Sequence, residues 1–140
     1  MKLRHALFAL VLAAGCASLQ AREAMATFGE SYQGPKTLTV EVAPTAKGDQ
    51  ALIKVHGINH PWNGKVFLAT RRNGSDHATE YVIKHEGADY VMMLDGSKHG
   101  QRVYLPGQGE LGLTFDRPAS LEVKPEHLMT YFEQQREANK

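Results

Sequence analysis

The sequence contains a single cysteine, Cys16, so no disulfide bond can form within the chain. An exported protein could use disulfides, because its compartment permits them. The fold must therefore be held together by its hydrophobic core. An unpaired cysteine in an exported protein also requires an explanation of its own. The lack of cysteine clusters further removes the usual ligands of structural zinc sites.

Long hydrophobic runs are scarce as well. The apolar run at 6–14 (ALFALVLAA) is too short to cross a bilayer, which takes about 20 apolar residues. It follows the basic segment 1–5, and this order is typical of a secretory signal. No later segment approaches that length. The sequence therefore predicts an exported protein with no membrane-spanning helix.

Two cleavage sites are compatible with a leader at 1–21. Cleavage after Gly15 would leave Cys16 as a lipidated N-terminus, which is the bacterial lipoprotein pattern. Cleavage near Ala21 would discard the cysteine. The unpaired cysteine favours lipidation slightly. We expect a periplasmic protein that is anchored at the outer membrane if Cys16 carries lipid, with no other contact to the membrane.

The chain also lacks an excess of charge of either sign. It has 16 Lys and Arg against 15 Asp and Glu, and loss of Lys2 and Arg4 with the leader leaves 14 basic residues. Nucleic-acid binders carry a marked basic patch or stripe. No block of like charges forms a tail either. We therefore expect no nucleic-acid partner.

What the sequence does contain is alternation of apolar and polar residues. About 120 residues remain after processing, enough for one domain with its own core. From Thr37 onward, short alternating runs are separated by turn residues, as in half-buried antiparallel strands. The expected strands are 37–42, 51–55, 66–70, 79–84, 89–94, 101–105 and 110–116, with a further short one at 119–123. The residues expected in the core are Val40, Ile53, Leu68, Ile83, Leu113 and Phe115.

Seven to eight short strands with short connections predict an all-β domain. The two architectures that fit are a small antiparallel meander barrel and a sandwich. Strands of about six residues should leave an interior filled by side chains and no large ligand cavity. We expect residues 37–140 to form this single β domain, preceded by a tether at 22–36.

The C-terminal part follows a different period. Pro125 suits the first turn of a helix. Leu128, Tyr131 and Phe132 then form a narrow apolar stripe at helical spacing. We expect one C-terminal amphipathic helix at 125–138.

Recognition chemistry is densest in the loop 56–65, between two expected strands. The predicted partner-binding residues are His56, His60, Trp62, Asn63 and Lys65. Pro61 pushes His60 into an extended conformation, and a stiff loop loses less entropy on binding. Trp62, the only tryptophan, has two interpretations. It is either an exposed binding anchor or a plug that closes one end of the barrel.

A second loop, 95–100 (DGSKHG), is the next candidate for binding. In a strict meander the connections alternate between the two ends. The loops 56–65 and 95–100 should then lie at opposite ends, which argues against one site built from both.

Metal and catalytic signals are weak. The combination that suggests soft copper ligation is His127 and Met129 with Met92 and Met93. Met92 and Met93 should point to opposite faces of a strand, so both cannot serve one site. No motif fixes a nucleophile beside a base. We expect no enzyme activity, no cofactor and no specific metal site.

Binding to a macromolecule is the class that remains. We expect an exported protein-binding module whose partner is another envelope protein. Its specific form would be an inhibitor or immunity-type protein that acts on a lytic enzyme. This expectation rests on analogy of architecture and compartment. The first alternative is a structural or assembly lipoprotein subunit of an envelope complex, and the second is a periplasmic copper-binding protein.

Overall fold

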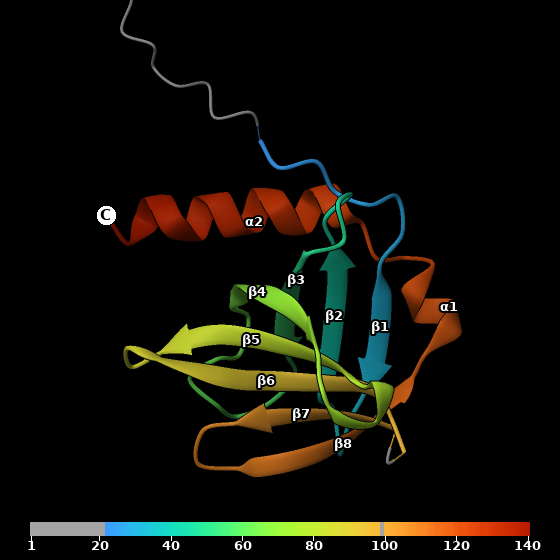
Figure 1. Cartoon of the computed structure of the whole chain (residues 1–140). Coiled ribbons are helices and arrows are strands. Elements are labelled where there is room, and N and C mark those ends of the chain that lie inside the picture. The colour runs from blue at the N-terminus through green and yellow to red at the C-terminus, as the bar shows by residue number, and fades with distance from the viewer. Residues whose placement is uncertain (1–21, 99) are drawn as a thin grey trace, which may run out of the picture.

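The computed structural model describes residues 22–98 and 100–140. The expected leader and Cys16 lie outside this part of the chain. The strands are β1 (Glu30–Gln33), β2 (Thr39–Pro44), β3 (Gln50–His56), β4 (Val66–Asn73), β5 (Thr79–His85), β6 (Ala88–Ser97), β7 (Gly100–Leu105) and β8 (Gly109–Phe115) (Figure 1). The helical segments are the 3₁₀ turn η1 (Ser75–His77), α1 (Arg117–Ser120) and α2 (Pro125–Ala138).

The eight strands form a closed barrel with meander topology. Each strand pairs antiparallel with the next one, as short connections require. Pairing of β1 with β8 closes the sheet, but only through Tyr32 opposite Phe115 and Gln33 opposite Thr114. The predicted antiparallel meander with a C-terminal helix is confirmed, and of the two expected architectures the structure is the barrel.

The stretch 22–36, expected to be a tether, instead contributes the first strand. Tyr32 of β1 is buried in the barrel interior, and Met25 forms an isolated bridge with Thr45. The prediction was wrong because β1 is only four residues long. A run of that length contains too few alternations to be distinguished from a loop. The domain therefore begins before residue 37.

Residues 119–123, expected as a short strand, form no strand. The Asp116 carboxylate accepts a hydrogen bond from the Ala119 backbone N–H at 3.0 Å and so caps α1. The hydroxyl of Ser120 then accepts the backbone N–H of Ser31 at 2.8 Å, which fixes α1 against β1. This helical turn starts directly after β8 because a cap and a following proline are both present.

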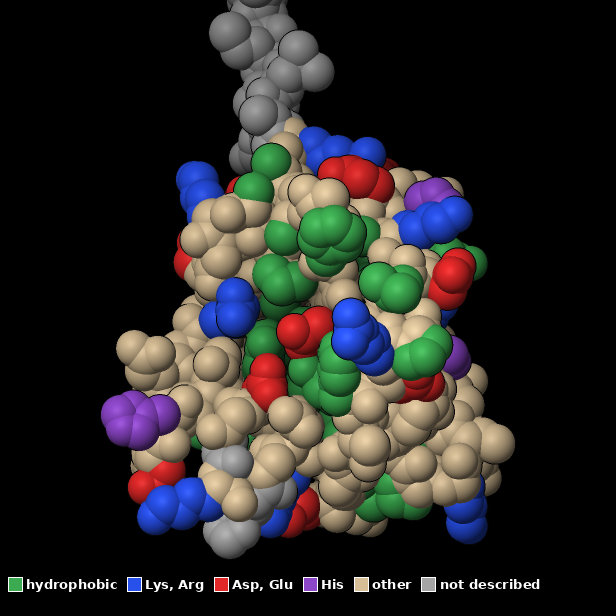
Figure 2. Space-filling model, turned by 90° about the vertical axis from the view of Figure 1, so that its right-hand side faces the viewer, with side chains coloured by type: hydrophobic (Ala, Val, Ile, Leu, Met, Phe, Trp, Pro, Cys, Tyr) green, Lys and Arg blue, Asp and Glu red, His purple; other side chains and the backbone are tan. Residues whose placement is uncertain are grey.

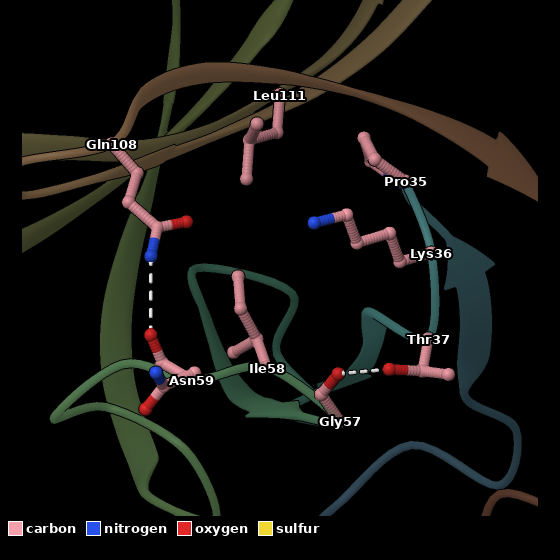
Figure 3. A pocket seen from close by; sticks show the side chains of 8 residues that line it. All are labelled: Pro35, Lys36, Thr37, Gly57, Ile58, Asn59, Gln108 and Leu111. Atoms are coloured by element: carbon pink, nitrogen blue, oxygen red, sulfur yellow. Dashed lines mark hydrogen bonds between the residues drawn. The ribbon is translucent and has the colours of Figure 1, made fainter.

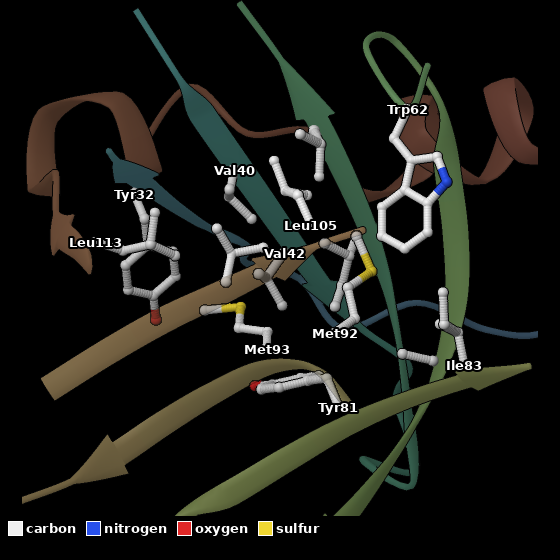
Figure 4. Close-up of a cluster of buried hydrophobic side chains, with 14 of the residues drawn as sticks. Tyr32, Val40, Val42, Trp62, Tyr81, Ile83, Met92, Met93, Leu105 and Leu113 are labelled. Atoms are coloured by element: carbon white, nitrogen blue, oxygen red, sulfur yellow. The ribbon is translucent and has the colours of Figure 1, made fainter. Parts of the chain in front are cut away.

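Side chains fill the barrel interior, as the strand length predicts (Figure 4). The buried interior cluster is Tyr32, Leu38, Val40, Val42, Ala51, Ile53, Val55, Trp62, Ala69, Tyr81, Ile83, Met92, Met93, Val103, Leu105 and Leu113. Ile58, Phe67, Tyr90 and Leu111 are half-buried against it. Burial of this apolar surface is the main stabilising contribution in a chain without disulfides.

Met92 and Met93 are both fully buried in this cluster, so the expected alternation fails at this point. The pairing of β5 with β6 shifts between Tyr81 and Val82. Tyr81 lies opposite Met93, whereas Val82 lies opposite Val91. Met92 is therefore the extra residue of a β-bulge, which interrupts the alternation and lets both methionines face inward.

Of the residues expected in the core, four are buried as predicted: Val40, Ile53, Ile83 and Leu113. Leu68 is half-buried on the outer face, against α2. Phe115 contradicts the prediction, because 46% of its surface is exposed. It is the last residue of β8 and lies at the barrel mouth, where its ring packs edge-on against Tyr32 at 5.7 Å. The strand alternation was correct, but the barrel ends before it can enclose this ring.

Helix α2 covers the outer face of β2, β3 and β4 (Figure 1). Leu128 and Met129 are buried there with Ala43, Leu52 and Val66. Tyr131, expected in the packing stripe, is exposed, and Met129 takes that place.

The C-terminal half of α2 is attached by a polar contact. The Gln135 amide accepts the backbone N–H of Val66 at 3.0 Å and donates to its carbonyl at 2.8 Å. This contact extends the packing of α2 beyond its first two turns. Neither helix in the described part of the chain combines the length and apolar character needed to cross a bilayer.

Candidate functional site

The connection between β3 and β4 lies at the barrel end that also carries the β1–β2, β5–β6 and β7–β8 connections. We call this the plugged end. The alternation of a meander places the β6–β7 connection at the other end, which we call the open end. The expected separation of the loops 56–65 and 95–100 is therefore confirmed. His99 of the second loop is not among the described residues.

Trp62 closes the plugged end from inside. Only 7% of its surface is exposed, and it belongs to the interior cluster. Its indole lies 4.7 Å from the Phe67 ring and 5.8 Å from the Tyr90 ring, measured between centroids. The rings of His60 and His85 lie at 5.6 and 5.5 Å. Of the two interpretations of Trp62, the structure shows the plug.

The His60 ring fixes the loop around this plug. Its Nδ1 accepts the backbone N–H of Trp62 at 3.0 Å. An acceptor role for Nδ1 leaves Nε2 as the protonated nitrogen in the neutral ring, so Nε2 donates to the Pro106 carbonyl at 2.8 Å. The β3–β4 loop is thereby joined to the turn between β7 and β8.

Asn63 stabilises the loop internally. Its side-chain oxygen accepts the backbone N–H of Ile58 at 3.2 Å, and its own N–H donates to the His60 carbonyl at 3.0 Å. The N–H of Gly64 donates to the Val55 carbonyl at 2.7 Å. These bonds give the loop a single defined shape although most of its residues lie at the surface.

The five predicted binding residues have different positions. Asn63 and Lys65 are exposed, together with Asn59 and Pro61. His60 is half-buried and Trp62 is inside. His56 lies on the barrel wall, with Nε2 at 3.7 Å from a Glu41 carboxylate oxygen. Asn63 and Lys65 thus lie at the surface of the loop, whereas Trp62 and His60 hold the loop in place from inside.

A cleft of about 440 Å³ lies beside this loop (Figure 3). It is lined by Pro35, Lys36, Thr37, Gly57, Ile58, Asn59, Gln108 and Leu111. Apolar side chains of Ile58 and Leu111 line it, and the Lys36 side chain points into it (Figure 3). We call it the seam cleft, because it lies where β1 and β8 diverge.

The walls of the seam cleft are fastened to one another. The Thr37 hydroxyl donates to the Gly57 carbonyl, and Gly57 has φ +78° with the Thr37 carbonyl so close that no Cβ would fit. Across the cleft, the Gln108 side-chain amide donates to the Asn59 carbonyl at 3.2 Å (Figure 3). The cleft is therefore preformed.

Sequence reasoning missed Lys36, Gln108 and Leu111. The meander topology did contain one indication that these residues lie near the loop. In a meander the β1–β2, β3–β4 and β7–β8 connections lie at the same end. The proximity itself depends on closure of the barrel between β1 and β8, and β1 was not recognised.

At the open end the interior is polar. Strand register places Glu30, Arg71, Asp95 and Gln101 on inward-facing positions. The Tyr32 hydroxyl donates to Glu30, and the Gln101 amide donates to Asp95 at 3.1 Å.

Burial and neighbouring charges both shift the pKa values of the tyrosines at the open end. The Arg71 guanidinium lies 5.6 Å from the Tyr81 ring centroid, and its Nε is buried without a hydrogen-bond partner among the described residues. Burial raises the pKa of Tyr32, and Glu30 raises it further. Burial also raises the pKa of Tyr81, which the positive charge of Arg71 opposes.

Outside the open end lies a shallow apolar groove. Phe28 is 76% exposed and Leu121 is 73% exposed, and both line it together with Phe115. Figure 2, which faces the side of the molecule with β1 and α1, shows hydrophobic side chains gathered near the middle of this face. Charged side chains of both signs lie among them.

The residues considered for copper do not converge. Met92 and Met93 lie inside the barrel, whereas Met129 is buried outside it under α2, and His127 is exposed. Within residues 22–98 and 100–140, no three His, Cys, Asp or Glu side chains gather in an arrangement that could hold a metal ion.

Comparison of the chain with protein-family models, with curated proteins and with solved structures gave no match.

Proposed function

We propose that this chain is a protein-binding module of the cell envelope, and that the β3–β4 loop at the plugged end contacts the partner. The observation that carries the proposal is the way this loop is held. A buried tryptophan and a set of hydrogen bonds fix its backbone, while Asn59, Pro61, Asn63 and Lys65 remain at the surface.

A loop that is ordered before binding has less entropy to lose when it binds. The filled interior supports the same class, since a barrel packed with side chains offers no inner site for a small ligand. The specific form that we propose is an inhibitor or immunity-type protein whose loop enters the cleft of a lytic enzyme. Analogy of architecture and predicted compartment supports this narrower step.

The test uses a variant that changes the exposed side chains of the loop and keeps Trp62 and His60, which hold it from inside. Asn59→Ala, Pro61→Ala and Lys65→Glu together alter the exposed side chains and leave Trp62 and His60 untouched. The purified protein and this triple variant would be titrated into assays of peptidoglycan hydrolysis by muramidases and amidases. Binding to each enzyme would be followed by calorimetry.

We expect the natural chain to inhibit at least one enzyme and the triple variant to bind at least tenfold more weakly. Lys47→Glu, in an exposed turn at the open end, is the matched control and should bind as the natural chain does. Inhibition that is equal for the natural chain and the triple variant would remove the loop from the site. Absence of any binding to these enzymes would contradict the inhibitor form.

A second candidate is an assembly subunit, and the apolar groove at the open end favours it. Exposed contiguous apolar patches often mark interaction sites in soluble proteins. Phe28→Ser with Leu121→Ser should then abolish co-purification with an envelope complex, while the loop triple variant should retain it. The reverse result would favour the loop.

The lipid anchor is a separate proposal, since Cys16 lies outside the described residues. A lipidated chain should partition into detergent, and Cys16→Ser should abolish this. Intact mass measurement of the mature N-terminus checks it directly. A mature protein that starts at Arg22 would exclude the anchor.

A further inference from the structure

The pairing at the barrel seam leaves one strand partly uncovered. β8 pairs with β7 along residues Gly109 to Leu113, but its pairing with β1 is limited to Thr114 and Phe115. In the described part of the chain, Gly109 to Leu113 therefore have a strand neighbour on one side only. The β1–β2 turn diverges from β8 here and opens the seam cleft.

Strand alternation identifies which backbone groups face the opening. The Asp116 N–H donates to the Ser31 carbonyl on the β1 side at 2.9 Å. Because successive residues of a strand direct their N–H and C=O to opposite sides, Thr114, Gly112 and Glu110 also face that side. Thr114 pairs with Gln33, whereas Gly112 and Glu110 lie beyond the end of β1.

An uncovered strand edge recognises one kind of ligand in particular. Two residues of β8 present backbone donors and acceptors at the spacing of a β-strand, which match the main chain of another extended segment. The outward face at Gly112 is also unobstructed, since a Cβ added there would meet no atom within 4 Å. A side chain added at Gly112 would therefore project from the outer face of the barrel without a clash.

The side chains around the edge define the segment further. Ile58 and Leu111 provide an apolar surface, and the Asn59 and Gln108 amides lie at the rim. Lys36 points into the cleft (Figure 3). None of the ion pairs among the described residues includes Lys36. An acidic group on the segment would complement its charge.

The backbone of Lys36 adds an independent observation. Its φ is +56°, in the left-handed region, where glycine is favoured and a side chain adds strain. The lysine therefore occupies a turn position that glycine would fit better, and its side chain points into the cleft (Figure 3). We propose that the seam cleft binds an extended, acidic segment of the partner protein, which adds as a strand to the free edge of β8 and pairs its carboxylate with Lys36.

This inference rests on the proposed function and names how the partner is held. The test is a selection of random heptapeptides displayed on phage against the purified full chain, followed by synthesis of the enriched peptides and titration by calorimetry. Enriched sequences should alternate apolar and polar residues and carry Asp or Glu. Binding should fall about tenfold or more with Lys36→Gly and with Gly112→Pro, which removes the backbone donor.

Two matched controls separate these effects from general damage. Gly112→Ala keeps the N–H and should bind as the natural chain does. Lys47→Gly removes an exposed turn lysine at the other end and should also have no effect. Thermal melts identify any variant that fails to fold. For the natural chain, amide exchange at Gly112 should be fast in the free protein and should slow on peptide binding.

Failure to select any peptide that binds below 100 µM would overturn the inference. Selected peptides whose affinity is unchanged by Lys36→Gly and Gly112→Pro would also overturn it, as would an amide of Gly112 that stays unprotected in the complex. An envelope partner that binds these two variants normally but loses the loop triple variant would leave the proposed function standing and refute this inference alone.

Discussion

The two ends of the barrel are built in opposite ways. At the plugged end the interior is apolar, closed by Trp62, and the exposed loop residues include the polar side chains of Asn59, Asn63 and Lys65. At the open end the interior carries Glu30, Arg71 and Asp95, and the exposed groove outside is apolar. The plugged end is filled by a buried aromatic side chain and hydrogen bonds of its loop, whereas the interior of the open end contains hydrogen bonds between polar side chains. Within each end, the buried side chains and the exposed side chains therefore differ in chemical character.

The largest effect is expected from Trp62→Ala. Removal of a buried aromatic side chain leaves a cavity, and the free energy of unfolding should fall by about 3–5 kcal/mol. Urea melts of the natural and variant chains measure this directly. A loss below about 1 kcal/mol would show that the indole is not enclosed and would restore its role as a surface anchor.

The next effect concerns alkaline pH and distinguishes the open end. Burial raises the pKa of Tyr32 and Tyr81 in the folded chain. The unfolded chain releases these protons above about pH 10, whereas the folded chain keeps them. Stability should therefore be full below pH 10 and should decrease as pH rises above it.

Absorbance at 295 nm follows this transition. Tyr32 and Tyr81 should titrate only together with unfolding. The Tyr81→Phe variant should show a shallower loss of stability with rising pH. Reversible titration of Tyr32 and Tyr81 in a chain that stays folded would contradict the buried positions of these two phenols.

A smaller effect is expected from Phe115→Ala. Because 46% of this side chain is exposed, its truncation removes only part of the apolar burial that Trp62→Ala removes. We expect a loss of about 1–1.5 kcal/mol in the free energy of unfolding. A loss of 3 kcal/mol or more in the same urea melts would mean that the barrel encloses the ring.

The smallest effect should come from Leu121→Ser. This side chain is 73% exposed, so the free energy of unfolding should change by no more than about 0.5 kcal/mol. Urea melts of the natural and variant chains measure this change. Marked destabilisation would place Leu121 in a packed core.

Much of the fold could be predicted because alternation is a local signal. Val40, Ile53 and Ile83 were placed correctly from the period of two, and Pro125 marked the helix start. The errors arise where a feature depends on the partner strand. The β-bulge that turns Met92 inward is a property of the pairing between β5 and β6. The sequence of β6 alone does not predict it.

The candidate site was predictable only in part. The loop was identified because Trp62, His60 and Pro61 are adjacent in the sequence. Lys36 and Gln108 join the same surface only after β1 and β8 meet, and that contact spans most of the domain. The direction of the Trp62 side chain likewise depends on tertiary structure, because its indole packs against Phe67 of β4 and Tyr90 of β6.

The short pairing of β1 with β8 also has a kinetic consequence. Closure joins Tyr32 to Phe115, so it is the pairing with the greatest sequence separation among the strands. Loop closure of this kind costs the most chain entropy, and contacts of high sequence separation slow folding. We expect the successive hairpins from β2 to β8 to assemble first and β1 to lock the barrel last. In a chain that emerges from its N-terminus first, one edge of β1 therefore stays unpaired until β8 has been formed.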